Sequence, residues 1–343
     1  MKKDRLKILY VGNKVVQRGQ TPTTIDTLAP LLEENYDVIT TSDKKNILLR
    51  ALDIIYTLYR NRTTTNIIIV DTYSTKNFYV SVLVAFFANY FHIKYLPYLH
   101  GGNLPKRLES HPKISKYIFK NSAINIAPSK YLENAFIEKG YKTLLIPNNI
   151  ELSLYPFKER TKLSPKLLYV RALSKVYNPL MLIRVLDKLL KLYPDAELCM
   201  VGPDKDGTLE AIKKEASKLN ILEHIKFTGK LPKKEWIELS KEYDIFVNPT
   251  NFDNQPVSII EAMALGFPIV STNVGGLPFL IDHNFNGILV DKNDTEKMTQ
   301  EIINLLENQK KVNMLSKNAR RKAETFSWKN IEKQWEKLLN ESA

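Results

Sequence analysis

Residues 243–276 read YDIFVNPTNFDNQPVSIIEAMALGFPIVSTNVGG and hold one complete strand–loop–helix–strand unit. The apolar run 243–250 is a predicted strand, and NFDNQP is the loop that follows it. Pro256 suits the first helical turn, where its missing N–H costs nothing, and Gly266 suits the left-handed residue that ends the helix. The run FPIVST then begins the next strand. Strand and helix in alternation predict a parallel sheet with right-handed crossovers.

The same alternation runs through the whole chain. The first half contains six apolar runs, LKILYVG, YDVITT, NIIIVDTYS, IKYLPYLHGG, AINIAPS and KTLLIPNN, and the second contains KLLYVRALS, AELCMVGP, IKFTGK, YDIFVNPT, FPIVSTNVGG and GILVDK. Nearly continuous apolar strands are expected when helices cover both faces of a sheet. We therefore predict two doubly wound α/β domains, 1–155 and 156–326, with a polar connection over 148–165 and a terminal helix over 327–343.

The composition is that of a folded protein with two domains. The chain has 343 residues, of which 44% are hydrophobic and 25% charged, and this length exceeds the range of a single core. Cys199 is the one cysteine, so no intrachain disulfide forms and a reducing compartment fits. The N-terminal MKKDRLKILYVG lacks the long apolar region of a signal peptide and is interpreted as a first strand. The longest apolar stretch, 78–91, is shorter than the roughly 20 residues that span a bilayer, and we expect a buried helix there rather than one that dips into a membrane.

The charge is uneven. The net charge is +13, and residues 1–150 hold 21 Lys and Arg against 11 Asp and Glu, so the first half carries +10 of it. A basic excess indicates a polyanionic partner, either nucleic acid or an anionic membrane surface, or else a solvated basic surface. A nucleic-acid interface would show clustered Lys and Arg among aromatic platforms, and here the basic residues are spread out.

Two carboxylates, Asp253 and Glu261, are separated by seven residues in the opening segment. Asp253 lies in the predicted loop before the helix, and Glu261 lies more than one turn inside it. The five residues from Pro256 to Glu261 rise about 7.5 Å, so the two side chains can hold different parts of one extended ligand. No histidine or third carboxylate accompanies them, which argues against a metal pair. The residues alone also allow an ordinary helix with an incidental glutamate.

The segment resembles the signature of glycosyltransferase family 4, whose members are retaining enzymes with the GT-B fold. Asp-Asn-Gln-Pro stands where Glu-Gly-x-Pro is commoner, while Glu261-Ala-Met-Ala-Leu-Gly-Phe-Pro matches closely. The resemblance implies that Glu261 accepts hydrogen bonds from the ribose of a sugar nucleotide. It also implies that Asp253 and the amides of the next two residues hold the donor sugar. The departure from the common pattern at Asp253 puts the sugar contact in question.

Other segments resemble the family in chain order. LHGGN, 99–103, resembles the turn at the edge of the acceptor domain, and GNKVVQRGQTPTTI, 12–25, resembles the loop that closes over the donor phosphate. The latter is not the G-x-G-x-x-G fingerprint of nicotinamide enzymes. The segment YVRALSKVYNP, 169–179, stands where the family usually has a Gly-Arg and a Lys that neutralise the diphosphate. VGPD, 201–204, and FTGKL, 227–231, resemble the loops that contact the nucleotide base. Phe279 stands where the family often has an acidic residue. The implied site residues are catalytic His100, Asp253 and Glu261; donor-binding Gly19, Arg171, Lys175, Gly202, Lys230, Asn254, Gln255, Pro256, Val257 and Glu261; and acceptor-binding Gly101, Gly102 and Asn103.

The predicted fold class is therefore α/β of the GT-B type, with two Rossmann-like domains facing a central cleft and a C-terminal helix crossing back to the first domain. The resemblance implies a cytoplasmic glycosyltransferase that takes a UDP- or GDP-sugar as donor and a saccharide or lipid-linked acceptor, as in bacterial polysaccharide assembly. We expect no metal, no other cofactor and no nucleic-acid partner. We do expect peripheral association with the inner face of an anionic membrane. A synthase or phosphorylase of the same fold would share the pocket, and a nucleic-acid-binding protein is the more distant alternative.

Overall fold

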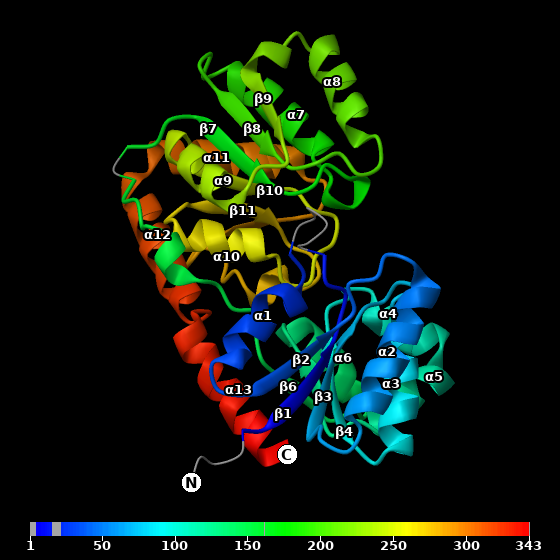
Figure 1. The fold of residues 1–343 in the computed structure, drawn as a ribbon. Coiled ribbons are helices and arrows are strands. Elements are labelled where there is room, and N and C mark those ends of the chain that lie inside the picture. The colour runs from blue at the N-terminus through cyan, green and yellow to red at the C-terminus, as the bar shows by residue number, and fades with distance from the viewer. Residues whose placement is uncertain (1–4, 16–21, 161, 343) are drawn as a thin grey trace. The chain divides into compact units, whose positions relative to one another are not determined.

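The computed structural model describes residues 5–15, 22–160 and 162–342, and these form two compact units. The first unit comprises Met1–Pro147 with Glu332–Ala343, and the second comprises Asn148–Ile331. Each contains one six-stranded parallel sheet with helices on its faces (Figure 1). The predicted α/β fold class with two doubly wound sheets is confirmed. Gly19 of the predicted donor set lies outside the described residues.

The first unit has the strand order β2-β1-β3-β4-β5-β6. Its strands are β1 (Lys7–Val11), β2 (Asp37–Thr41), β3 (Ile67–Thr72), β4 (Lys94–Leu99), β5 (Asn125–Ala127) and β6 (Thr143–Leu145). Its helices are α1 (Thr24–Glu33), α2 (Ile47–Asn61), α3 (Phe78–Tyr90), α4 (Leu104–Ser110), α5 (Pro112–Lys120) and α6 (Lys130–Glu138). The chain runs outward from β1 to β2 and then returns to β3 on the other side of β1. Ligands of doubly wound sheets bind at such a reversal, beyond the carboxyl ends of the strands.

The second unit repeats the plan with the order β12-β11-β10-β7-β8-β9. Its strands are β7 (Lys166–Val170), β8 (Glu197–Val201), β9 (Ile225–Gly229), β10 (Ile245–Asn248), β11 (Ile269–Thr272) and β12 (Ile288–Val290). Its helices are α7 (Leu180–Leu190), α8 (Thr208–Lys218), α9 (Lys233–Leu239), α10 (Val257–Ala264), α11 (Thr295–Glu307), α12 (Gln309–Glu324) and the start of α13 (Trp328–Ser342). Short 3₁₀ turns lie at Leu152–Leu154, Lys175–Tyr177, Leu222–His224, Ser240–Glu242 and Leu277–Phe279. Here the direction reverses between β7 and β10.

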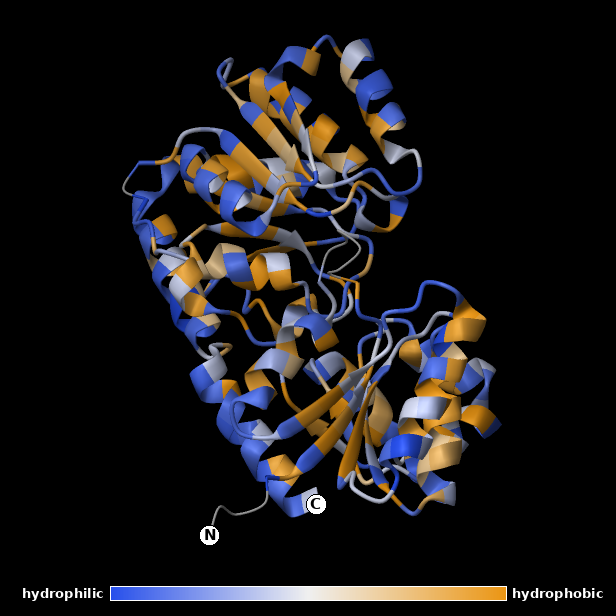
Figure 2. Ribbon diagram, in the orientation of Figure 1, coloured by the Kyte–Doolittle hydropathy of each residue, from blue (hydrophilic) through white to orange (hydrophobic). Residues whose placement is uncertain are grey.

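Most strand residues are apolar, as the orange colour of the strands in Figure 2 shows, and the central strands are buried. The four residues Ile67–Val70 of β3 are each 0% exposed, as is Cys199 on β8. A strand buried on both faces gains the transfer free energy of every side chain, about 0.8 kcal/mol per methylene group. The thiol of Cys199 is buried, and burial raises its pKa above the ordinary value.

The helix in the opening segment begins one residue later than predicted. Pro256 has extended backbone, with ψ of 113°, and stands as the N-cap of α10, so the first helical residue is Val257. The carbonyl of Pro256 accepts the N–H of Ile259, which closes the first turn. At the other end Gly266 has a φ of +78°, in agreement with the predicted left-handed end.

The boundary between the units differs from the predicted one. The first unit ends at Pro147 rather than at residue 155, because Ile150 and Tyr155 are buried in the core of the second unit. The terminal helix enters the first unit at Glu332 rather than at 327. There Trp335 is 1% exposed, and its ring meets that of Tyr98 edge-on at 5.5 Å.

The apolar stretch at 78–91 forms α3 but is buried on one face only. Phe78, Val84 and Ala88 are 0% exposed, whereas Tyr79 and Tyr90 are 52% and 70% exposed. The prediction of a buried helix is therefore wrong for the outer face of α3. No helix in the described ranges is both long enough and apolar enough to cross a bilayer.

Candidate functional site

In the first unit, His100 and Asp71 meet at the carboxyl edge of the sheet. Asp71 lies near the end of β3, and His100 follows the neighbouring strand β4. The Nε2 of His100 lies 2.8 Å from Oδ1 of Asp71, and the hydroxyl of Tyr10 donates to the same oxygen at 2.9 Å. Since an ionised carboxylate can only accept, the Nε2 of His100 donates this hydrogen bond. Nδ1 lies 3.5 Å from the hydroxyl of Thr24.

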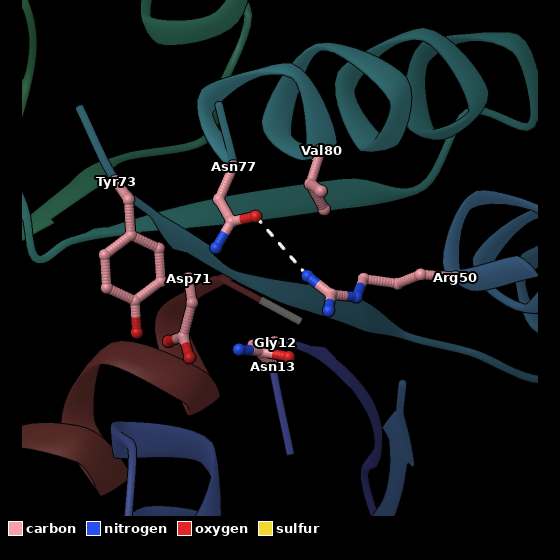
Figure 3. Close-up of a pocket in the computed structure, with 7 residues that line it drawn as sticks. All are labelled: Gly12, Asn13, Arg50, Asp71, Tyr73, Asn77 and Val80. Carbon is pink, nitrogen blue, oxygen red and sulfur yellow. Dashed lines mark hydrogen bonds between the residues drawn. The ribbon is translucent and has the colours of Figure 1, made fainter. Parts of the chain in front are cut away.

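Asp71 was missed in the sequence, and its position makes it a site residue. It is 2% exposed, and its second oxygen, Oδ2, is buried with no hydrogen-bond partner among the described residues. Figure 3 shows it in a pocket of about 10 Å³ beside Tyr73, Asn77 and Gly12, with Asn13 next to it. The Oδ1 of Asn13 is a second buried acceptor that lacks a described donor. Either acceptor can take a hydrogen bond from one hydroxyl group or one water molecule, for which the pocket has room. An acid at the end of the run NIIIVDT was the signal available in the sequence.

The predicted acceptor residues Gly101, Gly102 and Asn103 form the turn between β4 and α4. Gly101 is buried, and a Cβ placed on it would lie 2.4 Å from the backbone nitrogen of Ser74. This glycine therefore serves close backbone packing. Gly102 is half-buried and Asn103 is exposed, so these two can contact a ligand.

In the second unit, Arg171 and Asp253 pair with each other at the sheet reversal. Arg171 follows β7, and Asp253 lies in the loop after the adjacent strand β10. The guanidinium Nη2 donates to Oδ2 of Asp253 at 2.6 Å, and the guanidinium lies 4.5 Å from the centre of the Tyr177 ring. The other carboxylate oxygen accepts the N–H of Asn254 at 2.8 Å. Burial raises the pKa of Asp253 above its ordinary value, against the opposing effects of Arg171 and that N–H.

This pairing changes the interpretation of both residues. The resemblance assigns Arg171 to the diphosphate and Asp253 to the donor sugar, yet in the structure each is the other's partner. Because both oxygens of Asp253 already accept hydrogen bonds from the protein, its carboxylate is positioned as a binding and orienting group. The Arg171–Asp253 pair thus presents a guanidinium edge and a fixed loop at the carboxyl ends of β7 and β10.

Glycines hold this pair in place. A Cβ on Gly202 would lie 2.0 Å from the carbonyl oxygen of Arg171, and one on Gly276 would lie 1.7 Å from that of Asn254. The N–H of Gly276 donates to the carbonyl of Asp253 at 2.9 Å. Gly202 therefore packs directly against the backbone of Arg171, and Gly276 packs against the turn that carries Asp253. Gly202 was predicted as a ligand contact, and the structure gives it this packing role.

We expect Gly276→Ala to impair donor binding, because the new methyl group must push the Asp253–Asn254 turn away. Overpacking of this kind costs about 1–3 kcal/mol of stability. Gly140→Ala is the control, because Gly140 lies in the first unit and its added Cβ has nothing within 4 Å, while its φ of +78° imposes a backbone cost of its own. Donor-induced thermal shifts measure the difference. An unchanged shift in Gly276→Ala would contradict the positioning role.

Glu261 lies on α10, with its side chain buried and bonded on one oxygen. The hydroxyl of Tyr155 donates to Oε1 at 2.5 Å, and Nζ of Lys233 lies 2.9 Å from the same atom. Among the described residues both contacts use Oε1, so Oε2 can accept a hydrogen bond from a ligand. Burial and the neighbouring carboxylate raise the pKa of Tyr155 well above its ordinary value, so this tyrosine stays a donor. Glu261 is therefore a hydrogen-bond acceptor with a fixed orientation.

The loop between Asp253 and α10 is only partly available for a ligand. The N–H of Asn254 is occupied by the Asp253 carboxylate, and Oε1 of Gln255 accepts the N–H of Asn148 at 3.1 Å. The first amides of a helix have no intrahelical carbonyl, so the N–H of Val257 points out of the helix start. An anion or a hydroxyl at that end is favoured by the helix dipole.

The other predicted donor cations lie at strand ends of the same unit. Lys175 begins the 3₁₀ turn after β7 and is exposed, and Lys230 follows β9 and is exposed. The turn is anchored by Asp206, whose Oδ2 accepts the N–H of Lys175 at 3.0 Å and the hydroxyl of Ser174 at 2.8 Å. These bonds fix the backbone of Lys175, and its ammonium group makes no ion pair among the described residues.

We expect Asp206→Asn to lower stability in a way that depends on pH. Hydrogen bonds from Thr208, Lys175 and Ser174 lower the pKa of Asp206 to about 2, against about 3.9 in an unfolded chain. The carboxylate therefore adds stability above about pH 4 and loses it as the pH falls toward 2. Urea unfolding of both proteins should show a gap in midpoint near neutral pH that closes in acid. A gap independent of pH would contradict this.

No metal site accompanies these residues in the part of the chain that the structure describes. No three His, Cys, Asp or Glu side chains there gather closely enough to hold an ion. The charged groups of the second-unit site are those already described.

The sequence of the second unit matches a known family model over residues 155–322, described as glycosyl transferases group 1. Residues 155–322 are therefore similar to the group 1 glycosyltransferases. This segment contains Arg171, Asp253 and Glu261 together with the glycines that support them. It holds every residue predicted to bind the donor except Gly19.

Curated relatives match part of the chain. D-inositol 3-phosphate glycosyltransferase of Corynebacterium kroppenstedtii is 28% identical over 165 residues, covering 47% of this chain and 37% of the relative. Amylovoran biosynthesis glycosyltransferase AmsK of Erwinia amylovora is 27% identical over 253 residues, covering 68% of this chain and 60% of the relative. The chain thus spans less than two thirds of the length of either protein.

Solved structures resemble the whole chain. Sucrose-phosphate synthase from Thermosynechococcus elongatus has a TM-score of 0.79 at 17% identity, covering 98% of this chain and 99% of that one. Anabaena HepE in complex with UDP-glucose has a TM-score of 0.75 at 18% identity, covering 98% and 100%. At this identity the likeness establishes the fold, which is that of the GT-B glycosyltransferases. The segment similar to group 1 glycosyltransferases therefore lies in the second of the two Rossmann-like units.

Proposed function

We propose that this protein is a retaining glycosyltransferase of family 4 that transfers a hexose from a nucleotide sugar to a saccharide or lipid-linked acceptor. The observation that carries the proposal is Glu261 in the segment similar to group 1 glycosyltransferases, buried, oriented by Tyr155 and Lys233, with Oε2 left for a ligand. A carboxylate so held accepts hydrogen bonds from the two vicinal hydroxyls of a ribose. Charge-assisted bonds of this kind are roughly twice as strong as neutral ones.

The donor is bound by the second unit in this proposal. Glu261 takes the ribose, the start of α10 and Arg171 face the diphosphate, and the Asp253 turn faces the sugar. Lys175 and Lys230 add positive charge near the leaving group, which stabilises the transition state without a metal. A UDP-sugar is the first donor to test, because a structural relative was solved with UDP-glucose. A GDP-sugar is the second.

The first unit receives the acceptor in this proposal. Asp71 orients His100, and its free Oδ2 accepts a hydroxyl group that enters the pocket of Figure 3. Hydrogen bonds from Arg171 and the N–H of Asn254 make the Asp253 carboxylate a weaker nucleophile. Transfer on one face of the sugar, with the departing phosphate accepting the acceptor proton, then accounts for retention. The protein supplies alignment and charge.

A cellular setting completes the proposal. The relative AmsK belongs to amylovoran biosynthesis by its name, and we propose that this chain likewise serves a bacterial surface polysaccharide or glycoconjugate. We place it in the cytoplasm, at the inner face of the membrane, where a lipid-linked acceptor would be presented. The basic first half, with +10 of the net charge, supports that placement.

A panel of UDP- and GDP-sugars in a thermal-shift assay tests the donor assignment. A ligand at a hundred times its dissociation constant stabilises by about 2.7 kcal/mol, which moves the melting temperature by a few degrees. The turnover product with the best donor should keep the anomeric configuration by NMR, and treatment with EDTA should leave the rate unchanged. A free sugar phosphate as product would identify a phosphorylase instead. Absence of stabilisation by every nucleotide and nucleotide sugar would overturn the proposal.

A further inference from the structure

The outer face of α2 and α3 in the first unit carries large apolar side chains in solvent. We call this set the α2–α3 surface. Leu48 and Tyr90 are the most exposed, at 71% and 70%. The surface consists of Ile47, Leu48, Leu49, Leu52, Tyr56 and Tyr59 of α2 and Tyr79, Phe86 and Tyr90 of α3.

On α2 the exposed apolar residues follow a helical spacing. Leu48, Leu52, Tyr56 and Tyr59 recur every three or four positions, which places them on one face. The opposite face packs on the sheet through Ile54 and Leu58, each 1% exposed. The helix is therefore apolar toward the core and apolar again toward solvent. A helix at the surface of a globular protein usually has a polar outer face, so the outer stripe needs a separate explanation.

The exposed residues of the two helices form one continuous surface. The ring of Tyr59 lies 6.3 Å from that of Phe91, just after α3, and Phe91 lies 5.2 Å from Tyr90 and 5.9 Å from Phe87. Phe87 in turn meets Phe86 edge-on at 5.2 Å. At the other end of the helices Arg50 donates to Asn77 at 3.4 Å. The helices run side by side in the same direction between these two contacts.

Basic residues stand at both ends of the surface. Residues 43–62 and 76–94 together contain seven Lys and Arg against two acids, Asp43 and Asp53. Lys44, Lys45 and Lys76 lie before the two helices, and Arg60, Arg62 and Lys94 lie at or after their ends. The guanidinium of Arg62 lies 4.1 Å from the centre of the Tyr59 ring. Exposed apolar side chains beside basic ones supply the two contributions to interfacial membrane binding, which are buried apolar area and attraction to anionic lipids.

We propose that the α2–α3 surface docks on the headgroup region of an anionic lipid bilayer. Tyrosine, phenylalanine and leucine would enter the boundary between headgroups and acyl chains, and the basic ends would contact anionic headgroups. A second copy of the chain fits less well, because a two-fold contact would bring two basic surfaces together. This inference names the residues that make the membrane contact proposed above, and it rests on the proposed function for the choice of membrane. Vesicle binding is measured without donor or acceptor, so its failure and that of the transfer reaction are distinguishable.

Vesicle co-sedimentation of the full chain tests the inference. Wild type should bind vesicles that contain phosphatidylglycerol, bind phosphatidylcholine alone weakly, and release as salt rises. Two variants address the two components of the surface. The triple variant Leu48→Ser, Leu52→Ser and Tyr56→Ser removes apolar area, and Lys44→Gln, Lys45→Gln and Arg60→Gln removes charge. Each variant should weaken binding about tenfold or more. For the charge variant, this follows because each basic residue near such a surface contributes about a fivefold factor in affinity. For the serine variant, it follows because apolar area no longer enters the lipid.

Two controls keep the test interpretable. Leu192→Ser and Ile137→Ser change side chains that are 63% and 52% exposed outside the surface, and both should bind like wild type. Melting temperatures identify any variant that fails to fold, and light scattering after gel filtration gives the oligomeric state. The inference is overturned by wild type that ignores phosphatidylglycerol vesicles at low salt. Binding of both folded triple variants that equals wild-type binding overturns it as well. So does a wild-type dimer that the triple serine substitution dissociates.

Discussion

Replacing Glu261 by glutamine is expected to lower kcat/KM about a hundredfold while leaving the protein folded. Glutamine has nearly the same shape, and its carbonyl oxygen can still accept the Tyr155 hydroxyl that now bonds Oε1 at 2.5 Å. What disappears is the negative charge, and with it the charge-assisted bonds to ribose. Each such bond contributes about 1.5–3 kcal/mol when one partner is charged. Lys233 loses its partner at little cost, because its side chain is 52% exposed.

Tyr155→Phe is the control for Glu261. It removes the buried hydroxyl but keeps the carboxylate, so we expect a loss of about 1 kcal/mol in unfolding free energy and a much smaller kinetic change. Steady-state kinetics and UDP-induced thermal shifts of both variants separate the roles. If Glu261→Gln kept most of its kcat/KM and its thermal shift, Glu261 would be structural and the assignment of the ribose site would fall.

Removing Arg171 is expected to destabilise the second unit by about 3–5 kcal/mol, the cost of leaving a buried carboxylate without its partner. Arg171→Met takes away the guanidinium that lies 2.6 Å from Asp253, whose side chain is 10% exposed. The double variant with Asp253→Asn should recover much of that loss, because the amide needs no counter-ion. Urea unfolding of wild type, both single variants and the double variant measures the coupling.

The same cycle has a pH dependence that identifies the carboxylate as the cause. Burial already raises the pKa of Asp253, and loss of Arg171 raises it further. The native form of Arg171→Met therefore binds a proton more readily than the unfolded chain, so its deficit should shrink as the pH falls through the raised pKa. A deficit that ignores pH, with no coupling to Asp253→Asn, would mean that Arg171 serves only a bound phosphate.

Much of the fold could be predicted because the signals are local. Buried parallel strands read as continuous apolar runs, and each of the twelve predicted runs contains a strand. The position of Gly266, with φ of +78°, also follows from the chain around it. The domain boundary could not be placed as well, because Ile150 and Tyr155 look like part of a linker until the core that buries them is assembled. The exposed face of α3 was missed for the same reason, because the sequence of an apolar helix does not indicate which of its faces packs against the rest of the protein.

The sequence by itself determined two α/β sheets, a group of polar residues at strand ends, and Glu261 one turn inside the helix that follows the Asp253 loop. Only the tertiary structure decided which of those residues are partners. Arg171 and Asp253 lie 82 positions apart, and His100 and Asp71 lie 29 apart. Each pair meets because its two strands are neighbours in the sheet, and parallel strands bring their carboxyl ends to the same edge whatever the length of chain between them.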